Sequence, residues 1–200
     1  QPSQGISQFT NIDKISSEKI KKIYNLPQKY IFYPAMYLPH KNHKYVIDVI
    51  KIIKTEYKID LHAVFCGSDK GYLKKIKKYV EEQNQSKNII FLDFVDNEHL
   101  PYLYLNSLAL AMPTYSGPTN IPPWEAFKMG IPVLYSDIHN IKEVYKDAVY
   151  YIDPFEPKSM VTGIIDLINN KNLKDKLIAN GKKLLNSIDV DKAVSYTHLT

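Results

Sequence analysis

Residues 112–136 read MPTYSGPTNIPPWEAFKMGIPVLYS and decide the fold. An apolar, strand-like run ends at Met112, and a second one begins at Val133. Between them lie a turn-rich loop, a short helix and a Gly-Ile-Pro stop. A loop that leads from a strand into a helix directs backbone N–H groups at one place, which attracts anions and phosphate above all. The stretch therefore predicts a phosphate-binding turn between two strands.

Glu125 is the acidic residue of the short helix in this stretch. A carboxylate one helical turn beyond an anion-binding loop can accept hydrogen bonds from sugar hydroxyls. An anion-binding loop beside a hydroxyl acceptor is the pair of features that a nucleotide-sugar site needs. The alternative is structural, because a glutamate in the first turn of a helix also complements the helix dipole.

Outside this stretch, short apolar runs alternate with segments whose apolar residues have helical spacing. This alternation predicts an α/β fold with right-handed crossovers, a Rossmann-like parallel sheet and helices on both faces. We expect strands at residues 30–34, 61–66, 88–92, 108–112, 133–135 and 149–152, and further helices at residues 17–24, 43–57, 69–82, 98–107, 141–146, 157–169 and 173–185. Ligands bind beyond the carboxyl ends of such strands, so the loops at residues 35–43, 67–72 and 113–121 should converge.

The pattern along the chain predicts one folded domain with a segment on each side of it. Residues 1–28 are polar and are expected to be a linker, and residues 29–193 form the nucleotide-sugar-binding domain. Residues 194–200 resemble the translation of a sequencing adapter, so we expect a non-native tail there. The chain begins with Gln1 rather than Met, so its true N-terminus is expected to be missing.

Charge limits how the chain can hold a phosphate. The 200 residues carry a net charge of +5, and every basic residue in that count is a lysine because there is no arginine. The planar bidentate fork of arginine is absent, so phosphate must be held by lysine point charges and backbone N–H groups. The lysines are spread along the chain, as is typical of solvated helix faces, and we expect no nucleic-acid partner.

Cysteine content and hydropathy indicate the cellular compartment. Cys66 is the single cysteine, so an internal disulfide is excluded and a reducing compartment is indicated. It lies in an apolar run, which favours a buried and inert thiol. No apolar run approaches the roughly eighteen residues needed to span a bilayer, and no signal peptide is visible. These features predict a cytoplasmic protein, with room for contact at the inner face of the membrane.

Four segments, in order and at matching spacing, resemble the C-terminal, donor-binding domain of family 4 glycosyltransferases, which have the GT-B fold. They read YPAMYLPHKNH at residues 33–43, FVDNEHLPYLY at 94–104, GPTNIPPWEAFKMGIPVLYSD at 117–137 and EVYKDAVYYIDP at 143–154. The match covers roughly residues 30–194. The resemblance implies a nucleotide-sugar donor, carrying UDP or GDP, and no other cofactor.

The resemblance assigns catalytic roles to Glu125 and Lys41. Glu125 matches the second of two family glutamates, which accepts hydrogen bonds from ribose hydroxyls. Lys41 matches a lysine that reaches the diphosphate of the donor. Two positions depart from the pattern: Gly117 stands where the first glutamate is expected, and Met36 stands where an arginine is expected.

The donor-binding assignments rest mainly on backbone groups. Pro118 has no N–H, so the phosphate-facing donors are expected at Thr119, Asn120 and Ile121, with Gly117 also in reach. The resemblance places the backbone of Val95 and Asp96 against the nucleobase, although a plain strand-to-turn role is nearly as good an explanation.

Several other polar residues are expected to be structural. Asn42 is predicted to cap the helix that follows it, and His40 and His43 are expected to pack in the loop rather than touch ligand. Asp189 and Asp191 form an Asp-x-Asp pair at the chain end, where we do not expect metal binding.

The favoured interpretation is the donor half of a retaining, metal-independent glycosyltransferase whose acceptor domain precedes residue 1. The acceptor is expected to be a polysaccharide or a lipid-linked sugar, which allows peripheral membrane contact. Two alternatives remain: another GT-B enzyme such as a nucleotide-sugar epimerase, and a non-catalytic sugar-nucleotide-binding domain.

Overall fold

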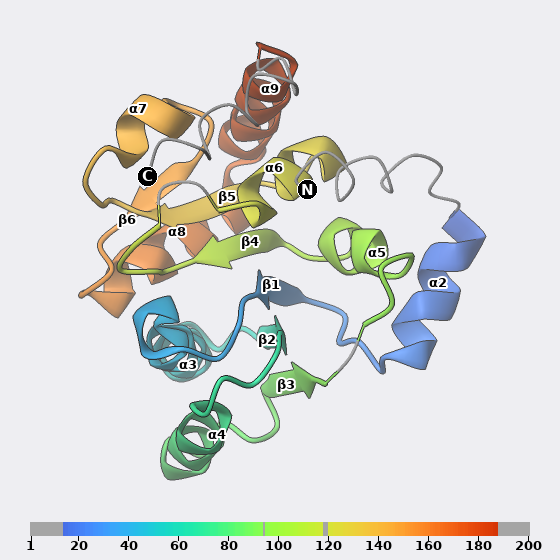
Figure 1. Cartoon of the computed structure of the whole chain (residues 1–200), viewed down its shortest axis with the longest axis vertical. Coiled ribbons are helices and arrows are strands. Elements are labelled where there is room, and N and C mark those ends of the chain that lie inside the picture. The colour runs from blue at the N-terminus through green and yellow to red at the C-terminus, as the bar shows by residue number, and fades with distance from the viewer. Residues whose placement is uncertain (1–13, 94, 118–119, 188–200) are drawn as a thin grey trace.

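The computed structural model describes residues 14–93, 95–117 and 120–187. In this part of the chain six strands form one parallel sheet in the order β3-β2-β1-β4-β5-β6 (Figure 1). The strands are β1 (Tyr30–Pro34), β2 (His62–Cys66), β3 (Ile89–Leu92), β4 (Ala109–Met112), β5 (Val133–Ser136) and β6 (Tyr150–Ile152). The predicted α/β class and parallel Rossmann-like sheet are confirmed.

Helices cover both faces of the sheet. On one face α3 (His43–Ile52) contacts α4 (Leu73–Glu82) and α8 (Pro157–Asn169). On the other, α5 (Leu100–Leu105) contacts α2 (Lys14–Ile23) and α6 (Pro122–Met129), and α9 (Lys171–Ser187) packs against both α6 and α8. The remaining helix is α7 (Ile141–Tyr145). Among the described residues no helix combines the length and apolar character needed to cross a bilayer.

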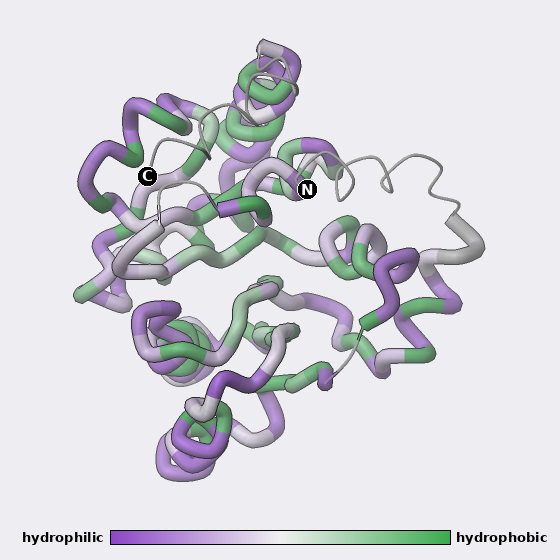
Figure 2. The backbone as a smooth tube through the Cα atoms, in the orientation of Figure 1, coloured by the Kyte–Doolittle hydropathy of each residue, from purple (hydrophilic) through white to green (hydrophobic). Residues whose placement is uncertain are grey.

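The core is continuous across the sheet because the central strands are buried on both faces. Every residue of β4 and β5 is buried, and so are the first four residues of β1. Figure 2 shows these strands as predominantly apolar segments, with the hydrophilic colour concentrated on the outer helices and loops. Unbroken apolar strands are what a parallel sheet covered by two helical layers requires.

Element boundaries differ from the predicted ones by a few residues, for local reasons. The helix expected at residues 43–57 is α3 followed by one π-helical turn, η2 (Ile53–Tyr57). The helix expected from residue 69 begins at Leu73, because the Asp69 carboxylate accepts hydrogen bonds from the N–H groups of Gly71, Tyr72 and Leu73 and so caps it.

The segment before residue 29 contains α2, which is packed on the domain. Ile20 of α2 is buried in the core, and Ser17 exchanges hydrogen bonds with the side chain of Asn106, beyond the end of α5. The domain boundary at residue 28 stays a prediction, although Ile20, Tyr24 and Leu26 pack in or against the core of the domain. The predicted tail at residues 194–200 and the Asp189–Asp191 pair lie outside the described residues.

The loops after β1 and β2 approach each other very closely. A side chain at Gly67 would place its Cβ atom 2.1 Å from the carbonyl oxygen of Ala35, so only glycine fits there. Burial raises the pKa of the neighbouring Cys66 thiol to about 11, which keeps it protonated and matches the inert role expected for it.

Candidate functional site

The candidate site lies at the point where the strand order of the sheet reverses, between β1 and β4. The chain moves outward from β1 to β2 and β3, then returns to β4 on the other side of β1. The loops that follow two neighbouring strands at such a switch point diverge and leave a crevice, which is where ligands bind in open α/β sheets. Lys41 and Asn120 lie on the two loops that follow β1 and β4.

Lys41 and Asn120 connect these two loops directly. Lys41 ends the short 3-10 turn η1 (Pro39–Lys41), and its Nζ donates a 3.0 Å hydrogen bond to Oδ1 of Asn120. The two residues are 79 positions apart in sequence, so the fold alone brings them together. Both were predicted to belong to the site.

Three further hydrogen bonds fix the backbone around Lys41. The Tyr33 hydroxyl donates to the carbonyl of Lys41 at 2.5 Å. The carbonyl of His40 accepts from the Thr114 hydroxyl at 3.2 Å and from the N–H of Tyr115 at 2.9 Å. The η1 turn is therefore held both from the core below it and from the loop after β4.

The ammonium group of Lys41 is available to an anionic ligand. No carboxylate lies within ion-pair distance of it among the residues that the structure describes. Burial lowers the pKa of Lys41 below its usual value, because a partly desolvated ammonium lacks the solvent that would stabilise its charge. A phosphate group placed there would restore that stabilisation.

Asn120 organises the loop after β4. Its Nδ2 donates to the carbonyl of Gly117 and, at 2.6 Å, to the hydroxyl of Tyr135. The Tyr135 hydroxyl in turn donates to the Gly117 carbonyl at 2.7 Å, and the Tyr145 hydroxyl donates to the Asn120 carbonyl at 3.2 Å. The Asn120 side chain thus presents its oxygen to Lys41 and uses its nitrogen to close the turn. Thr119, also predicted to bind donor, lies outside the described residues.

The structure gives a physical reason for glycine at position 117. Gly117 has φ of +97°, a conformation that other residues rarely adopt, and a Cβ atom there would lie 3.3 Å from Nδ2 of Asn120. A glutamate at this position would strain the turn that orients Asn120. The missing carboxylate is therefore part of this loop's geometry.

Glu125 lies in the first turn of α6 and is only 8% exposed. Its Oε2 accepts a 2.6 Å hydrogen bond from the buried hydroxyl of Tyr104 on α5. Burial raises the pKa of Glu125, and the Tyr104 hydrogen bond works in the opposite direction by stabilising the carboxylate. A buried, oriented carboxylate is more than a complement to the helix dipole.

Helix α6 is kept short by its sequence. Pro122 and Pro123 occupy its first turn, where their missing N–H groups cost little. Gly130 ends it in the left-handed conformation with φ of +68°, and the next residue, Ile131, donates back to the carbonyl of Ala126.

The other predicted donor-binding residues lie at loop surfaces. Ile121 precedes α6 and is exposed, as is Met36 after β1, which is 44% exposed and offers no charge to a phosphate. Asp96 follows β3 beside α2 and α5, where its N–H lies 3.4 Å from the Tyr24 hydroxyl. The role of Val95 and Asp96 toward the nucleobase stays a prediction.

Asn42 is the N-cap residue of α3, as predicted, and His43 packs inside the domain, as predicted. Asn42 occupies the cap position of α3 with φ of +57°, but its side chain makes no capping bond and donates instead to the carbonyl of Pro154 at 3.0 Å. His43 is buried among the rings of Tyr33, Tyr37 and Phe65. Burial lowers its pKa to about 3, so it is neutral and structural.

The family of the chain follows from comparison with known proteins. The sequence profile of the family described as glycosyl transferases group 1 matches residues 16–184, which is most of the chain. The chain belongs to this family.

Curated relatives of the chain include two O-antigen enzymes. The O-antigen chain mannosyltransferase RfbU of Salmonella typhimurium is 29% identical over 170 residues, which are 80% of this chain and 46% of that protein. The O-antigen chain mannosyltransferase B of Escherichia coli is 23% identical over 154 residues, 77% of this chain and 40% of that protein. The chain therefore spans less than half the length of these relatives.

Solved structures agree on the fold. The C-terminal domain of the group 1 family protein LpcC from Francisella tularensis superposes with a TM-score of 0.73 at 19% identity, covering 90% of this chain and 95% of that one. Anabaena HepE, solved with UDP and glucose, gives a TM-score of 0.79 at 15% identity, covering 97% of this chain and 55% of that one. The expected fold, the C-terminal half of a GT-B glycosyltransferase, is confirmed.

Sequence reasoning missed the tyrosines that hold the candidate site together. Tyr33, Tyr104, Tyr135 and Tyr145 all direct their hydroxyls at site residues, namely Lys41, Glu125, Gly117 and Asn120. The sixteen tyrosines of the chain were the available signal, since buried tyrosine hydroxyls usually find a polar partner. Which partner each finds depends on the fold.

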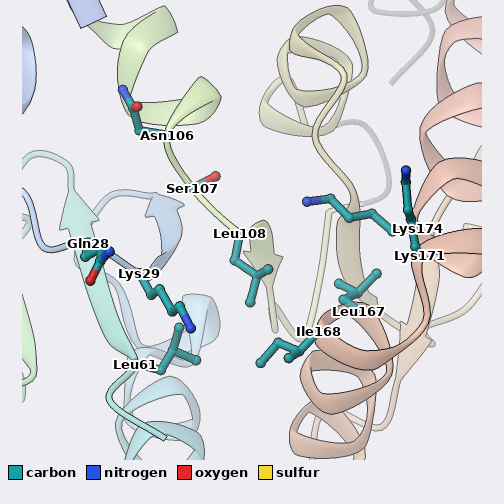
Figure 3. A pocket seen from close by; sticks show the side chains of 10 residues that line it. All are labelled: Gln28, Lys29, Leu61, Asn106, Ser107, Leu108, Leu167, Ile168, Lys171 and Lys174. Atoms are coloured by element: carbon teal, nitrogen blue, oxygen red, sulfur yellow. The ribbon is translucent and has the colours of Figure 1, made fainter. Parts of the chain in front are cut away.

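A cavity elsewhere in the domain does not belong to this site. It has a volume of about 430 Å³ and opens at the amino ends of β1, β2 and β4, beside α8 and α9 (Figure 3). Figure 3 shows apolar side chains at its centre and lysines at its rim, and the lining residues are Gln28, Lys29, Leu61, Asn106, Ser107, Leu108, Leu167, Ile168, Lys171 and Lys174. The candidate site lies at the opposite, carboxyl edge of the sheet.

Proposed function

We propose that this chain is the donor-binding half of a retaining, metal-independent glycosyltransferase. The observation that carries the proposal is the Lys41–Asn120 hydrogen bond, which places between the loops after β1 and β4 a cation that has no acidic partner among the described residues. That is the position at which an open α/β sheet receives a nucleotide. The family match supports the reaction class.

Lys41 would neutralise the leaving nucleoside diphosphate. Cleavage of the bond between the sugar and the diphosphate leaves negative charge on the phosphate oxygens, and a prepositioned cation stabilises that charge in the transition state. Lys41 is prepositioned by two hydrogen bonds: Tyr33 binds its backbone carbonyl, and Asn120 accepts from its ammonium group. The expected arginine is replaced by Met36, so Lys41 would carry this role with the N–H groups of the turn around Asn120.

Glu125 would bind the ribose of the donor. Its Oε2 is engaged by Tyr104, so we assign the ribose hydroxyls to Oε1. A hydroxyl donor would stabilise the ionised carboxylate and offset the burial that raises its pKa. The donor would then lie across the crevice, with its diphosphate at Lys41 and its ribose at the start of α6.

The relatives suggest the sugar and the setting. Two of them are named as O-antigen chain mannosyltransferases, so we propose transfer of mannose from a nucleoside-diphosphate donor to a growing polysaccharide or lipid-linked acceptor. The donor would need no additional cofactor and no metal. The acceptor-binding half would be supplied by sequence outside this chain, and the work would take place in the cytoplasm at the inner face of the membrane.

Calorimetry with UDP and GDP on the chain itself tests the donor site. Lys41→Met should lower the affinity at least about tenfold, the loss expected for one charge-assisted contact. Glu125→Ala should lower it as well. Lys87→Met is the matched control, since Lys87 is exposed in the turn before β3 at the amino edge of the sheet. Equal affinity in Lys41→Met, Glu125→Ala and the control would refute the site.

The departures at Gly117 and Met36 favour a non-catalytic sugar-nucleotide-binding domain as a second candidate. An epimerase on the same fold is a third. Product analysis on the full-length protein separates them, because a glycosyltransferase extends an acceptor, an epimerase converts the free nucleotide sugar, and a binding domain does neither. Transfer that Glu125→Ala abolishes would eliminate the non-catalytic candidate.

A further inference from the structure

Two solvent-exposed aromatic rings are stacked on each other at the carboxyl edge of the sheet. Tyr115, on the loop after β4, and Phe155, on the loop after β6, have ring centroids 5.2 Å apart and planes only 22° apart. Phe155 is 79% exposed and Tyr115 is 42% exposed. Each ring therefore exposes apolar area that no described part of the chain covers.

This exposure does not reflect a loosely attached loop. The carbonyls on either side of Phe155 are bound from α3: Asn42 donates to Pro154 at 3.0 Å, and the Tyr45 hydroxyl reaches Asp153 at 2.8 Å and Glu156 at 3.0 Å. The N–H of Phe155 itself donates to the Asp153 carboxylate at 2.8 Å. Four hydrogen bonds thus fix the backbone of the loop that carries this exposed apolar ring.

The stacked pair is connected to the donor site. The N–H of Tyr115 donates to the carbonyl of His40, the residue before Lys41, and Asn42, the residue after Lys41, holds the Phe155 loop. An acceptor hydroxyl must approach the sugar carbon attached to the diphosphate. If Lys41 holds that diphosphate, the pair lies at the rim from which an acceptor arrives.

The chemistry of the pair suits a sugar ring. A hexose has an apolar C–H face, which an aromatic ring covers, and hydroxyls at its edge, which need polar neighbours. Exposed polar residues lie near the pair in sequence: Ser116 follows Tyr115, and the carboxylates of Asp153 and Glu156 lie on either side of Phe155. Those carboxylates disfavour an anionic partner such as a charged lipid surface.

We propose that Tyr115 and Phe155 form a stacking subsite for a neutral hexose ring of the acceptor saccharide. This rests on the proposed function, because only a transferase needs an acceptor at the rim of the donor crevice. The subsite positions the acceptor and takes no part in bond making. Its two halves come from loops that are 40 residues apart in sequence and are brought together by the fold.

Saturation-transfer NMR with mannobiose on the 200-residue chain, with and without GDP, tests the subsite. Saturation should reach the sugar C–H protons. Phe155→Leu, which keeps apolar bulk but removes the ring, should weaken mannobiose binding about two- to tenfold, the range of one aromatic stacking contact. Phe155→Trp should retain it. Tyr57→Ala is the matched control, since Tyr57 is 46% exposed and lies on η2.

The outcomes separate this inference from the proposed function. Intact GDP binding in Phe155→Leu with weakened mannobiose binding supports both. If the parent chain binds GDP but not mannobiose, the subsite is refuted and the donor site is unaffected. The same holds if GDP binding is intact and Phe155→Leu and Tyr57→Ala bind mannobiose equally well. Self-association by sedimentation that Phe155→Leu abolishes would also refute it, because the rings would then contact a second copy. If the parent chain itself does not bind GDP, the proposed function is refuted instead.

Discussion

The hydroxyl of Tyr104 and the carboxylate of Glu125 form a buried 2.6 Å hydrogen bond between α5 and α6. Tyr104 is completely buried, and burial raises its pKa well above its usual range, so it stays protonated and acts as the donor. The bond fixes one oxygen of Glu125 and opposes the cost of burying its charge. Glu125 is thereby held in one orientation before any ligand arrives.

Tyr104→Phe should weaken nucleotide binding although residue 104 need not touch the nucleotide. Without the hydroxyl, Glu125 loses a partner and its pKa rises further. We expect a loss of about 1.5–3 kcal/mol in the free energy of unfolding, the range for hydrogen bonds to charged groups, measured in urea at neutral pH. Tyr102→Phe on the same helix is the control. Equal GDP affinity in both variants, measured by calorimetry, would contradict a positioning role.

Donor binding should weaken as the solution is acidified. Burial raises the pKa of Glu125 above its ordinary value of 4.5. Oε2 already accepts from Tyr104, so protonation would place a hydrogen on Oε1, the oxygen assigned to the ribose, and turn that acceptor into a donor. Affinity should therefore be full well above that raised pKa and fall as pH drops toward it. Calorimetry with GDP-mannose, whose diphosphate has no group titrating in this range, measures the effect between about pH 8 and about pH 5. Glu125→Gln should bind GDP-mannose more weakly than the parent, and its affinity should change less with pH. If its affinity fell with pH in parallel with that of the parent, another group would be responsible for the pH dependence.

Restoring the carboxylate that the family pattern places at position 117 should harm this protein. Gly117→Glu forces a side chain onto a backbone with φ of +97° and pushes it against Asn120. We expect a loss of about 1–2 kcal/mol of stability and weaker GDP binding, because Asn120 can no longer orient Lys41. Ser116→Glu adds the same charge without the strain. If Gly117→Glu bound GDP more tightly than Ser116→Glu, the glycine would not be the geometric requirement inferred here.

The neutral, buried His43 makes the fold sensitive to acid. Its folded pKa is lowered to about 3, whereas the unfolded chain takes up a proton near 6.5. Its stabilising contribution is thus complete above about pH 6.5 and is lost as pH falls from there toward 3. Between pH 6.5 and pH 4.5 this amounts to roughly 2 kcal/mol, from a limiting slope of about 1.4 kcal/mol for each pH unit.

His43→Phe keeps an aromatic ring among Tyr33, Tyr37 and Phe65 and removes the proton site. Urea unfolding of both proteins at the two pH values measures the difference. The variant should lose less stability than the parent by about that amount. His139→Phe, in the loop between β5 and α7, is the control. An identical acid loss in parent and His43→Phe would show that other groups cause it.

Periodicity and turn residues were enough to predict the order of strands and helices. The six predicted strands and the parallel sheet are observed, because short apolar runs bounded by turns leave few other arrangements. The helix at Pro157–Asn169 was predicted to the residue, since Pro157 opens it and the apolar spacing is regular. Helix starts shifted where a side chain caps from a distance, as Asp69 does for α4.

Sequence could nominate residues for the candidate site but not the hydrogen bonds that connect them. Lys41, Asn120 and Glu125 could be selected from sequence because their loops follow strands and resemble a known pattern. The bond between Lys41 and Asn120 depends on how two loops 79 residues apart are placed, which no local pattern encodes. Asn42 shows the same limit: a helix cap is a local rule, and its bond to Pro154 across the fold overrides that rule.

The tyrosine hydroxyls under the site have an implication for how such a protein can diversify. Tyr33, Tyr45, Tyr135 and Tyr145 all bind backbone carbonyls of the site loops, at Lys41, Asp153, Gly117 and Asn120. A carbonyl is present whatever side chain a residue carries. The path of each loop is therefore specified from inside the domain, and the outward residues can be exchanged without releasing it. New donor or acceptor preferences could arise by surface substitution alone, on loops whose course is inherited unchanged.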